Sequence, residues 1–390
     1  MKKQKVCIVG GGLTGLVTAA TLSKLDLDID LITSDNLASR SHTIRTTAIS
    51  QHNYNFLKKL GIYNFSNKNF WACKNMKLYI KNKNEKFSEI FEINKVNKKI
   101  LYMVNNSIFK KLLIQKLKKE KCVKFFKNEK ISNISDSGLL KTIHLRRKRE
   151  KKYNLLIICT GGFSDLEKFL FKDSSFNRLY NELSITAVFK HKYLENNIAR
   201  QFFLDNEILA LLPVSNKETS FVWTIKKNTK VRYDKKTSLI KKKIKFYIKN
   251  FYKNIKFTTK IEFKELKFSI RKKYFRDRVL LFGDSLHTVH PLTGQGFNMV
   301  LRDLSYLEKN LRNKISLGLD VGSLDTLQKF SDETKAKNFI YSLGIDSIKS
   351  FFSIKNKPLK EARNKIISKS NNNTFIKNML YNIADKGLNF

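Results

Sequence analysis

The sequence has few cysteines, no long apolar runs and no flexible linkers, and each shortage excludes a class of protein. The four cysteines have neither metal-ligand spacing nor a disulfide framework, so a reducing, cytoplasmic setting is expected. No stretch reaches the roughly 18 uninterrupted apolar residues that a membrane-spanning helix needs. The lysine-rich start resembles a signal peptide, but no A-x-A-like cleavage site follows it, so secretion is not expected.

Acidic residues are also few: 33 of them against 77 lysines and arginines give a net charge of +44. Such a charge is typical of nucleic-acid-binding proteins. Here the lysines are spread along the whole chain and accompany abundant Asn, Ile, Phe and Tyr. This pattern indicates a coding bias that acts on every tolerant position, and not a surface patch that binds phosphate. We therefore expect no nucleic-acid partner, and attraction to an anionic membrane surface is the main functional alternative.

Two segments leave several interpretations open. The basic, aromatic segment 241–248 could contact RNA, face a membrane, or form an amphipathic helix packed on a sheet. An apolar stripe near the C-terminus could dock on a bilayer, bind a partner subunit or pack in the core. The stripe consists of Phe375, Ile376, Met379, Leu380 and Ile383.

Glycine is scarce, and nine of the 15 glycines fall in three clusters, at 10–15, 161–162 and 283–296. In a chain that avoids glycine, these positions are expected to be fixed by backbone geometry. At the first cluster a strand leads into Gly10-x-Gly12-x-x-Gly15 and then a helix, and a second strand follows at 29–33. This pattern predicts a βαβ unit of a parallel sheet, whose glycine turn lets the backbone approach a pyrophosphate.

The third cluster belongs to the most informative stretch, 283–303. A strand ends there at Asp284, which can accept hydrogen bonds from a polyol or simply cap a turn. Further on, the run Gly294-Gln295-Gly296-Phe297-Asn298 opens a helix after the stiffening Pro291. The free N–H groups of such a helix suit the negative charge of a reduced flavin.

With the histidines of His287-Thr288-Val289-His290-Pro291, this stretch resembles the third motif of the group A flavoprotein aromatic hydroxylases. More narrowly, it is similar to the ubiquinone-biosynthesis hydroxylases, which combine this His-Pro with Gly-Gln-Gly-Phe-Asn and a downstream Leu-Arg-Asp. The segments 45–50, 212–213 and 222–224 resemble the same family, and the resemblance covers residues 5 to 390.

The resemblance implies an α/β fold: a Rossmann-like FAD-binding domain with a parallel sheet, an antiparallel-sheet substrate domain and a helical C-terminal tail. The FAD-binding domain is expected in three parts, at 1–75, 101–179 and 276–330. The substrate domain is expected at 180–275 with an insertion at 76–100, and the helical region at 331–390.

The resemblance also implies a reaction. The family binds FAD, reduces it with NAD(P)H, forms a flavin hydroperoxide with O2 and hydroxylates an electron-rich ring, so the cofactor does the difficult chemistry. The function implied here is an FAD-dependent monooxygenase acting on a polyprenylated phenol or quinone precursor in ubiquinone biosynthesis, without a metal. Its location would be cytoplasmic or peripheral on the inner face of the membrane, with other quinone-biosynthesis proteins as further partners.

The family's cofactor-binding positions carry over residue by residue. The pyrophosphate would lie on Gly10, Gly12, Leu13, Thr14 and Gly15, the phosphates or flavin edge near Arg45, and the ribityl chain at Asp284. The isoalloxazine would be lined by Pro291, Gly294, Gln295, Gly296, Phe297 and Asn298, and Thr33, Thr160 and Gly161 complete the set. No catalytic side chain is assigned: His287 and His290 are either an acid–base pair or packing residues, and Arg45 could be a surface residue.

Two departures affect these expectations. Thr33 stands where an acidic residue would accept from the adenosine ribose, so weaker adenosine binding is expected, with Asp35 as a substitute. Thr160 stands where the family has the aspartate that serves both FAD and the nicotinamide donor, and Glu167 replaces an arginine beyond it. The donor step is therefore open. Three alternatives follow: a flavin oxidoreductase with another substrate or donor, a non-catalytic subunit of a quinone-synthesis complex, and a basic RNA-binding protein.

Overall fold

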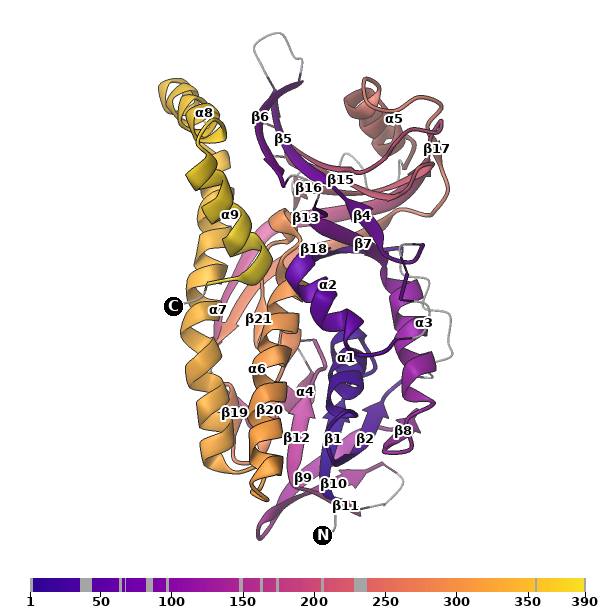
Figure 1. The fold of residues 1–390 in the computed structure, drawn as a ribbon, viewed down its shortest axis with the longest axis vertical. Helices are drawn as coiled ribbons and strands as arrows, with labels where there is room; N and C mark the ends of the chain where they lie inside the picture. The colour runs from indigo at the N-terminus through magenta and orange to yellow at the C-terminus, as the bar shows by residue number, and fades with distance from the viewer. Residues whose placement is uncertain are drawn as a thin grey trace.

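The computed structural model describes most of the chain, and two large sheets dominate it (Figure 1). The described residues are 3–35, 44–62, 65–66, 68–81, 87–95, 98–146, 150–161, 164–172, 175–204, 207–227, 237–354 and 356–388. The lower sheet in Figure 1 contains β1 and β2, the upper one contains β13 to β16, and α7, α8 and α9 lie along one side. The predicted α/β fold is confirmed.

The first sheet has six strands in the order β19-β20-β12-β1-β2-β8. All its pairs are parallel except β19 with β20. The strands are β1 (Gln4–Val9), β2 (Leu27–Thr33), β8 (Val123–Lys127), β12 (Leu155–Ile158), β19 (Phe275–Arg276) and β20 (Val279–Leu281). Helix α1 (Leu13–Leu22) connects β1 to β2, which confirms the predicted βαβ unit.

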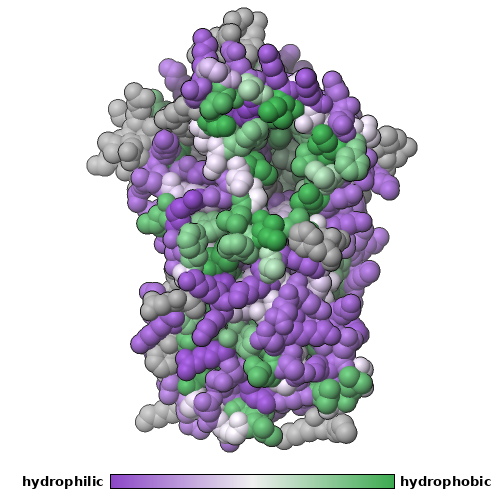
Figure 2. Space-filling view, turned by 90° about the vertical axis from the view of Figure 1, so that its left-hand side faces the viewer, coloured by the Kyte–Doolittle hydropathy of each residue, from purple (hydrophilic) through white to green (hydrophobic). Residues whose placement is uncertain are grey.

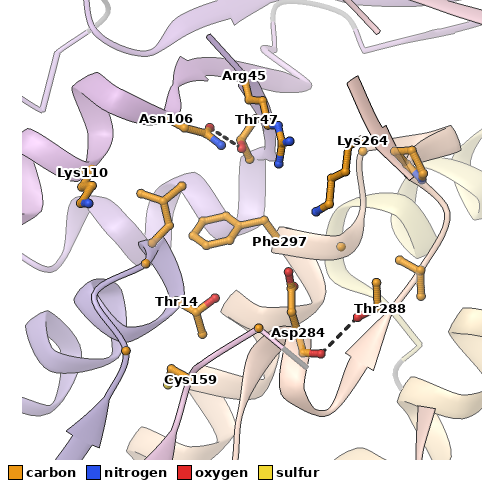
Figure 3. Close-up of a pocket in the computed structure, with 18 of the residues that line it drawn as sticks. Thr14, Arg45, Thr47, Asn106, Lys110, Cys159, Lys264, Asp284, Thr288 and Phe297 are labelled. Atoms are coloured by element: carbon orange, nitrogen blue, oxygen red, sulfur yellow. Dashed lines mark hydrogen bonds between the residues drawn. The ribbon is translucent and has the colours of Figure 1, made fainter. Parts of the chain in front are cut away.

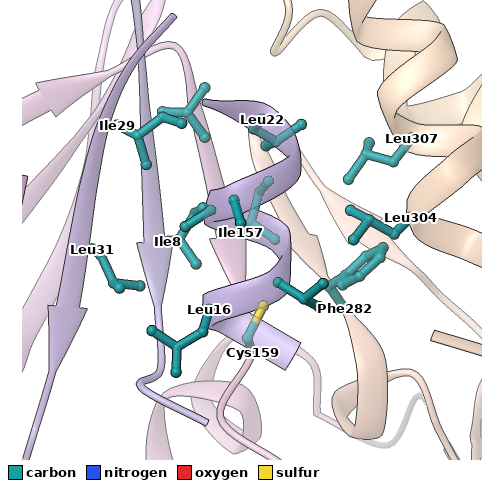
Figure 4. Packing of buried hydrophobic residues seen from close by; sticks show 14 of the residues in the cluster. Ile8, Leu16, Leu22, Ile29, Leu31, Ile157, Cys159, Phe282, Leu304 and Leu307 are labelled. Atoms are coloured by element: carbon teal, nitrogen blue, oxygen red, sulfur yellow. The ribbon is translucent and has the colours of Figure 1, made fainter. Parts of the chain in front are cut away.

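The core of this part lies between the parallel strands and the helices that cover them (Figure 4). Ile8 and Ile157 from neighbouring strands pack against Leu16 of α1, and each is fully buried. Parallel strands that are covered on both faces have continuous apolar sequences, as the runs at 6–9 and 155–158 do. Cys7 and Cys159 are ordinary members of this core.

The second sheet has nine strands in the order β21-β18-β13-β16-β15-β14-β5-β6, with β17 paired to β13. Its pairs are antiparallel, apart from the parallel pair of β14 with β5. The strands are β5 (Asn75–Lys81), β6 (Phe87–Asn94), β13 (Ser175–Lys190), β14 (Ile198–Leu204), β15 (Glu207–Ser215), β16 (Glu218–Lys226), β17 (Lys256–Phe257), β18 (Glu262–Arg271) and β21 (His287–Thr288). β13 passes through residue 180, where the sequence predicted a domain boundary.

Two small sheets and several helices complete the fold. The small sheets are β3 (Thr46–Ser50), β4 (Trp71–Cys73) and β7 (Leu101–Asn105), and β9 (Ile131–Ser137), β10 (Leu140–Leu145) and β11 (Glu150–Tyr153). The remaining helices are α2 (Gln51–Lys58), α3 (Asn106–Leu117), α4 (Asp165–Leu170), α5 (Thr237–Ile248), α6 (Gly296–Ser316), α7 (Leu324–Phe352), α8 (Lys357–Asn371) and α9 (Thr374–Lys386). Two short 3-10 helices, η2 (Gly283–Ser285) and η3 (Pro291–Thr293), precede α6.

Three predicted elements need correction. The apolar run 153–159 predicts one continuous strand, but the strand is interrupted at Asn154, because β11 pairs with β10 whereas β12 pairs with β1. The helix expected from 294 begins at Gly296, since Gly294 has a φ of 62° and ends η3. The basic run 235–257 has the periodicity of a helix, but within the described residues, which resume at 237, α5 ends at Ile248 and Lys256–Phe257 is a strand.

The two ambiguous segments are also clarified. α5 buries Ile240, Ile244 and Ile248 in a core cluster with the nine-stranded sheet, so segment 241–248 is an amphipathic helix packed on a sheet. On α9, by contrast, Phe375 is 76% exposed and does not pack in the core. Within the described parts of the chain, none of the helices combines the length and apolar character that a membrane span requires.

Candidate active site

A cavity of about 1030 Å³ is lined by residues of both large sheets, at the upper end of the range for ligand pockets. Figure 3 shows that segments far apart in the sequence meet there: Thr14 from the glycine turn, Asp284 from η2 and Phe297 from α6. Most of the predicted site residues line it. They are Gly10, Gly12, Leu13, Thr14, Arg45, Thr160, Gly161, Asp284, Pro291, Gly294, Gly296 and Phe297. Gly162, from the second glycine cluster, lies outside the described residues.

The glycine turn is built from close backbone contacts. Gly10 has a φ of +125°, and a Cβ there would collide with the carbonyl of Cys159. A Cβ at Gly15 would collide with the carbonyl of Gly10, so Gly15 supports the turn from behind and does not line the cavity. Gly12 is different: a Cβ there has no atom within 4 Å, since it faces open space at the N-terminus of α1. A phosphate could approach the backbone at this point.

Asp284 is held at the cavity by the turn that follows β20. Gly283 has a φ of +68°, and a side chain there would collide with Thr14. The turn is closed by Thr288, whose hydroxyl donates to the backbone carbonyl of Asp284 at 3.1 Å. The Asp284 carboxylate is exposed, lines the cavity and can accept hydrogen bonds from a ligand (Figure 3).

Besides Gly15, three predicted site residues do not line the cavity. Thr33 is buried and its hydroxyl donates to the carbonyl of Asp35 at 2.7 Å, so Ser34 and Asp35 line the cavity instead. Asn298 is fully buried, where it donates to the carbonyl of Ala48 and accepts from the N–H of Ser50. Asn298 therefore joins α6 to β3. Gln295 is also buried, as the N-cap of α6.

Thr160, itself exposed, contacts a buried polar cluster centred on Glu167. The Glu167 carboxylate is fully buried, accepts from Ser285 Oγ at 2.6 Å, and also accepts from the hydroxyl of Thr160. Its charge is balanced by Arg271, whose Nη2 lies 3.1 Å from Glu167 Oε2. Arg271 also donates from Nε to the carbonyl of Ser285. The cluster thus fixes the turn that carries Asp284 to α4 and to the end of β12.

Both motif histidines have buried partners. His287 Nε2 lies 2.8 Å from Asp303 Oδ2, in a site where neither side chain is appreciably exposed. His290 accepts the N–H of Leu292 through Nδ1 and lies 3.0 Å from Glu182 through Nε2. Burial lowers the pKa of His290, which favours the neutral ring that this pattern requires. These contacts hold the segment between η2 and α6 against α6 and β13.

Several cavity residues were missed in the sequence. Lys264 of β18 extends into the cavity beside Arg45, and burial together with the charge of Arg45 lowers its pKa (Figure 3). Nothing in the sequence distinguishes Lys264 from the rest of the 77 lysines and arginines. Arg45 itself forms an ion pair with Glu262, at 3.4 Å. On the opposite side, Thr47 donates to Asn106 at 2.6 Å, near Lys110.

One end of the cavity is formed by the nine-stranded sheet and by apolar residues of the neighbouring β3-β7-β4 sheet. The sheet residues that line this end are Met76, Ala199, Arg200, Gln201, Ala210, Leu212 and Val222. Leu101, Met103 and Ala48 add apolar surface from the β3-β7-β4 sheet. The cavity therefore has a polar end at the glycine turn and a largely apolar end at the sheet.

A family model described as FAD binding domain matches residues 3–330. The ubiquinone biosynthesis monooxygenase COQ6 of Dictyostelium discoideum is 21% identical to this chain, over 97% of the chain and 90% of its own length. The 3-demethoxyubiquinol 3-hydroxylase of Escherichia coli is 37% identical over 24% of each chain. Among solved structures, Pseudomonas aeruginosa PqsL in complex with 2-aminobenzoylacetate has a TM-score of 0.77 at 14% identity, covering 93% of this chain and 99% of its own. The p-nitrophenol 4-monooxygenase PnpA of Pseudomonas putida has a TM-score of 0.76 at 14% identity, with full coverage of both chains.

Proposed function

Because the chain belongs to the FAD binding domain family, we propose that it is an FAD-dependent monooxygenase that hydroxylates a polyprenylated phenol or quinone precursor in ubiquinone biosynthesis. The observation that carries the proposal is the similarity to a ubiquinone biosynthesis monooxygenase along 97% of the chain. The cavity supports it, since one end offers polar and backbone groups for a dinucleotide and the other offers an apolar surface for a ring.

The residues present fit FAD. The open space in front of Gly12 admits a pyrophosphate to the N–H groups of α1, where the helix dipole favours negative charge. Asp284 would accept from the hydroxyls of the ribityl chain, and the wall from Pro291 to Phe297 would hold the flavin ring. When bound, FAD supplies the activation of O2 and the transfer of one oxygen atom.

The protein's own contributions are orientation, charge and the exclusion of water. Lys264 and Arg45 bring positive charge into the cavity, and both would stabilise negative charge that develops on a bound group. The apolar sheet end would hold the substrate ring and keep bulk water from it. The interactions of Lys264 and Arg45 with a bound group would be stronger in such a dry site. NAD(P)H is the electron donor that we propose.

A second candidate is a flavin oxidoreductase supplied by another donor. It is favoured by Thr160, which stands where the family has an aspartate that serves the nicotinamide donor. The Thr160 hydroxyl carries no charge and already donates a hydrogen bond to Glu167. Rapid mixing of the purified flavoprotein with NADH or NADPH separates the two candidates. Flavin bleaching that a substrate accelerates supports the monooxygenase, and no bleaching by either nucleotide supports a separate donor.

The proposed pathway is tested by mass spectrometry of lipid extracts from cells without this chain. We expect accumulation of a polyprenylated phenol or quinone that lacks one hydroxyl, or the methoxyl derived from it. The position of the missing oxygen would name the ring carbon. An unchanged quinone profile would contradict the pathway assignment, and restoration by the Gly12→Val variant would indicate a non-catalytic subunit.

We also propose that the C-terminal helices contact the membrane that holds such a substrate. Figure 2 views the side on which α7, α8 and α9 lie and shows hydrophobic side chains gathered in the upper half of this face. The exposed apolar residues of these helices are Leu324, Phe339, Ile340, Leu343, Ile348, Phe351, Leu359, Ile366, Phe375, Met379 and Leu380. α8 and α9 also carry more lysines than acidic residues, which favours an anionic lipid surface.

Replacing Phe375 and Met379 together with glutamate is expected to reduce binding to vesicles that contain anionic lipid by at least about fivefold, because both side chains would leave the apolar layer. Co-sedimentation measures the bound fraction. Leu139→Glu is the matched control, since Leu139 is 81% exposed on the turn between β9 and β10. Equal binding by the double variant and the control would contradict membrane contact through this face.

A further inference from the structure

The apolar end of the cavity contains a polar side chain, Gln201, whose role nothing above explains. It lies on β14, beside Ala210 of β15, which in turn pairs with Val222 of β16. Residues paired directly across a sheet point to the same face. Since all three line the cavity, this row forms part of its floor.

The neighbouring residues on β14 and β15 confirm that the Gln201 side chain faces the cavity. Arg200 pairs with Leu211, and both belong to the opposite face of the sheet. There the Arg200 guanidinium donates to the hydroxyl of Tyr252, and Leu211 packs in the cluster that contains α5. Gln201 therefore directs its amide into the cavity, away from that cluster.

The surroundings leave this amide without a partner. Gln201 is only 3% exposed, and within the described part of the chain its side chain makes no hydrogen bond. Its nearest neighbours across the strands are Leu78 and Ala210, which have no side-chain polar atom. An amide in a cavity wall that has no protein partner can pair only with water or with a ligand, and a ligand that displaces the water has to replace its hydrogen bonds.

We propose that Gln201 orients the substrate ring by a hydrogen bond to one of its oxygen substituents. This inference rests on the proposed function and adds the residue that would select the substrate. The amide is uncharged and both donates and accepts, so it suits a phenol hydroxyl, a methoxyl or a quinone carbonyl.

The charges nearby restrict the class of ring further. Two cationic residues of this sheet line the cavity, Arg200 and Lys264. The Arg200 guanidinium donates to Tyr252 on the opposite face of the sheet. Lys264 of β18 lies four strands away from β14, or about 19 Å along the sheet at the usual strand spacing. A ring carboxylate beside Gln201 would be buried without a countercharge. The ring bound here is therefore neutral, such as a phenol and not a benzoate.

The test uses the purified FAD-loaded protein and three probes: 2-geranylphenol, geranylbenzene and 3-geranyl-4-hydroxybenzoate. Binding is followed by the change in flavin absorbance. Wild type is expected to bind the phenol at least about tenfold more tightly than the benzoate. The Gln201→Met variant, similar in volume, is expected to lose about tenfold in affinity for the phenol and nothing for geranylbenzene, because only the phenol loses a hydrogen bond.

Bound FAD per chain serves as the folding readout and should be equal in both proteins. Equal affinity of wild type and Gln201→Met for the phenol would overturn the inference, as would a preference of wild type for the benzoate. Loss of FAD from the variant would also overturn it, since Gln201 would then contact the cofactor. If wild type holds FAD but binds none of the probes, the proposed substrate class fails as well.

Discussion

Replacing Gly12 with valine is expected to abolish FAD binding without lowering the stability of the FAD-free protein. The backbone at Gly12, with φ −75° and ψ 178°, is open to any residue, and an added Cβ has no atom within 4 Å. The valine would instead fill the space through which a pyrophosphate reaches the backbone. We expect the Kd for FAD to rise at least about 100-fold. Flavin fluorescence measures the Kd, and urea denaturation of the FAD-free protein measures stability.

Two other glycines provide matched controls. In Gly15→Ala the Cβ would collide with the carbonyl of Gly10, so both FAD affinity and stability should fall. In Gly344→Ala, within α7, the Cβ has no atom within 4 Å, and the higher helix propensity of alanine should keep or raise stability with FAD still bound. A Gly12→Val variant that retains wild-type affinity would contradict the assignment of this turn to the cofactor.

Replacing Glu167 with alanine is expected to lower the free energy of unfolding by about 3–5 kcal/mol, because it leaves Arg271 as an unpaired buried charge. The Glu167 side chain is fully buried and Arg271 is 8% exposed, so water cannot replace the lost partner. Ser285 and Thr160 would lose their acceptor at the same time. The turn that carries Asp284 would then be released, so FAD affinity should fall too. Chemical denaturation and flavin titration measure the two effects.

A matched control is available on the same helix. Asp165→Asn removes the ion pair with Lys168, whose two side chains are 104% and 68% exposed, and should leave the denaturation midpoint unchanged. The double variant Glu167→Leu with Arg271→Met removes both charges and should recover part of the stability lost in Glu167→Ala. If Glu167→Ala and Asp165→Asn had equal midpoints, the buried pair would have no structural role.

The sequence predicted the parts of the site in which backbone geometry dictates the residue type. Gly10, Gly15 and Gly283 were recognisable because a side chain at each would collide with a neighbouring segment. The parallel strands were recognisable because burial on both faces requires uninterrupted apolar runs. Such local constraints act over a few residues, and one chain is enough to reveal them.

The predictions that were wrong or incomplete concern residues whose roles depend on contacts between distant segments. Asn298 appeared to be a cofactor ligand, yet its amide binds Ala48 and Ser50, some 250 residues away in the sequence. Glu167 appeared only to replace an arginine of the family, yet it is the buried partner of Arg271, 104 residues further along the chain. Gln201 gave no signal because alternation along a strand shows two faces but not which face borders a cavity.

The strand order of the parallel sheet has a consequence for the synthesis of the protein. β1 has β2 and β12 as its neighbours, and β12 in turn pairs with β20, which ends at Leu281. The ribosome therefore has to release most of the chain before the last partner of this sheet is available. Until then the apolar edge of β12 remains unpaired, and the loop that must close spans more than a hundred residues. Nascent chains with such late partners depend on slow, non-local pairing and are open to aggregation until β20 has left the ribosome.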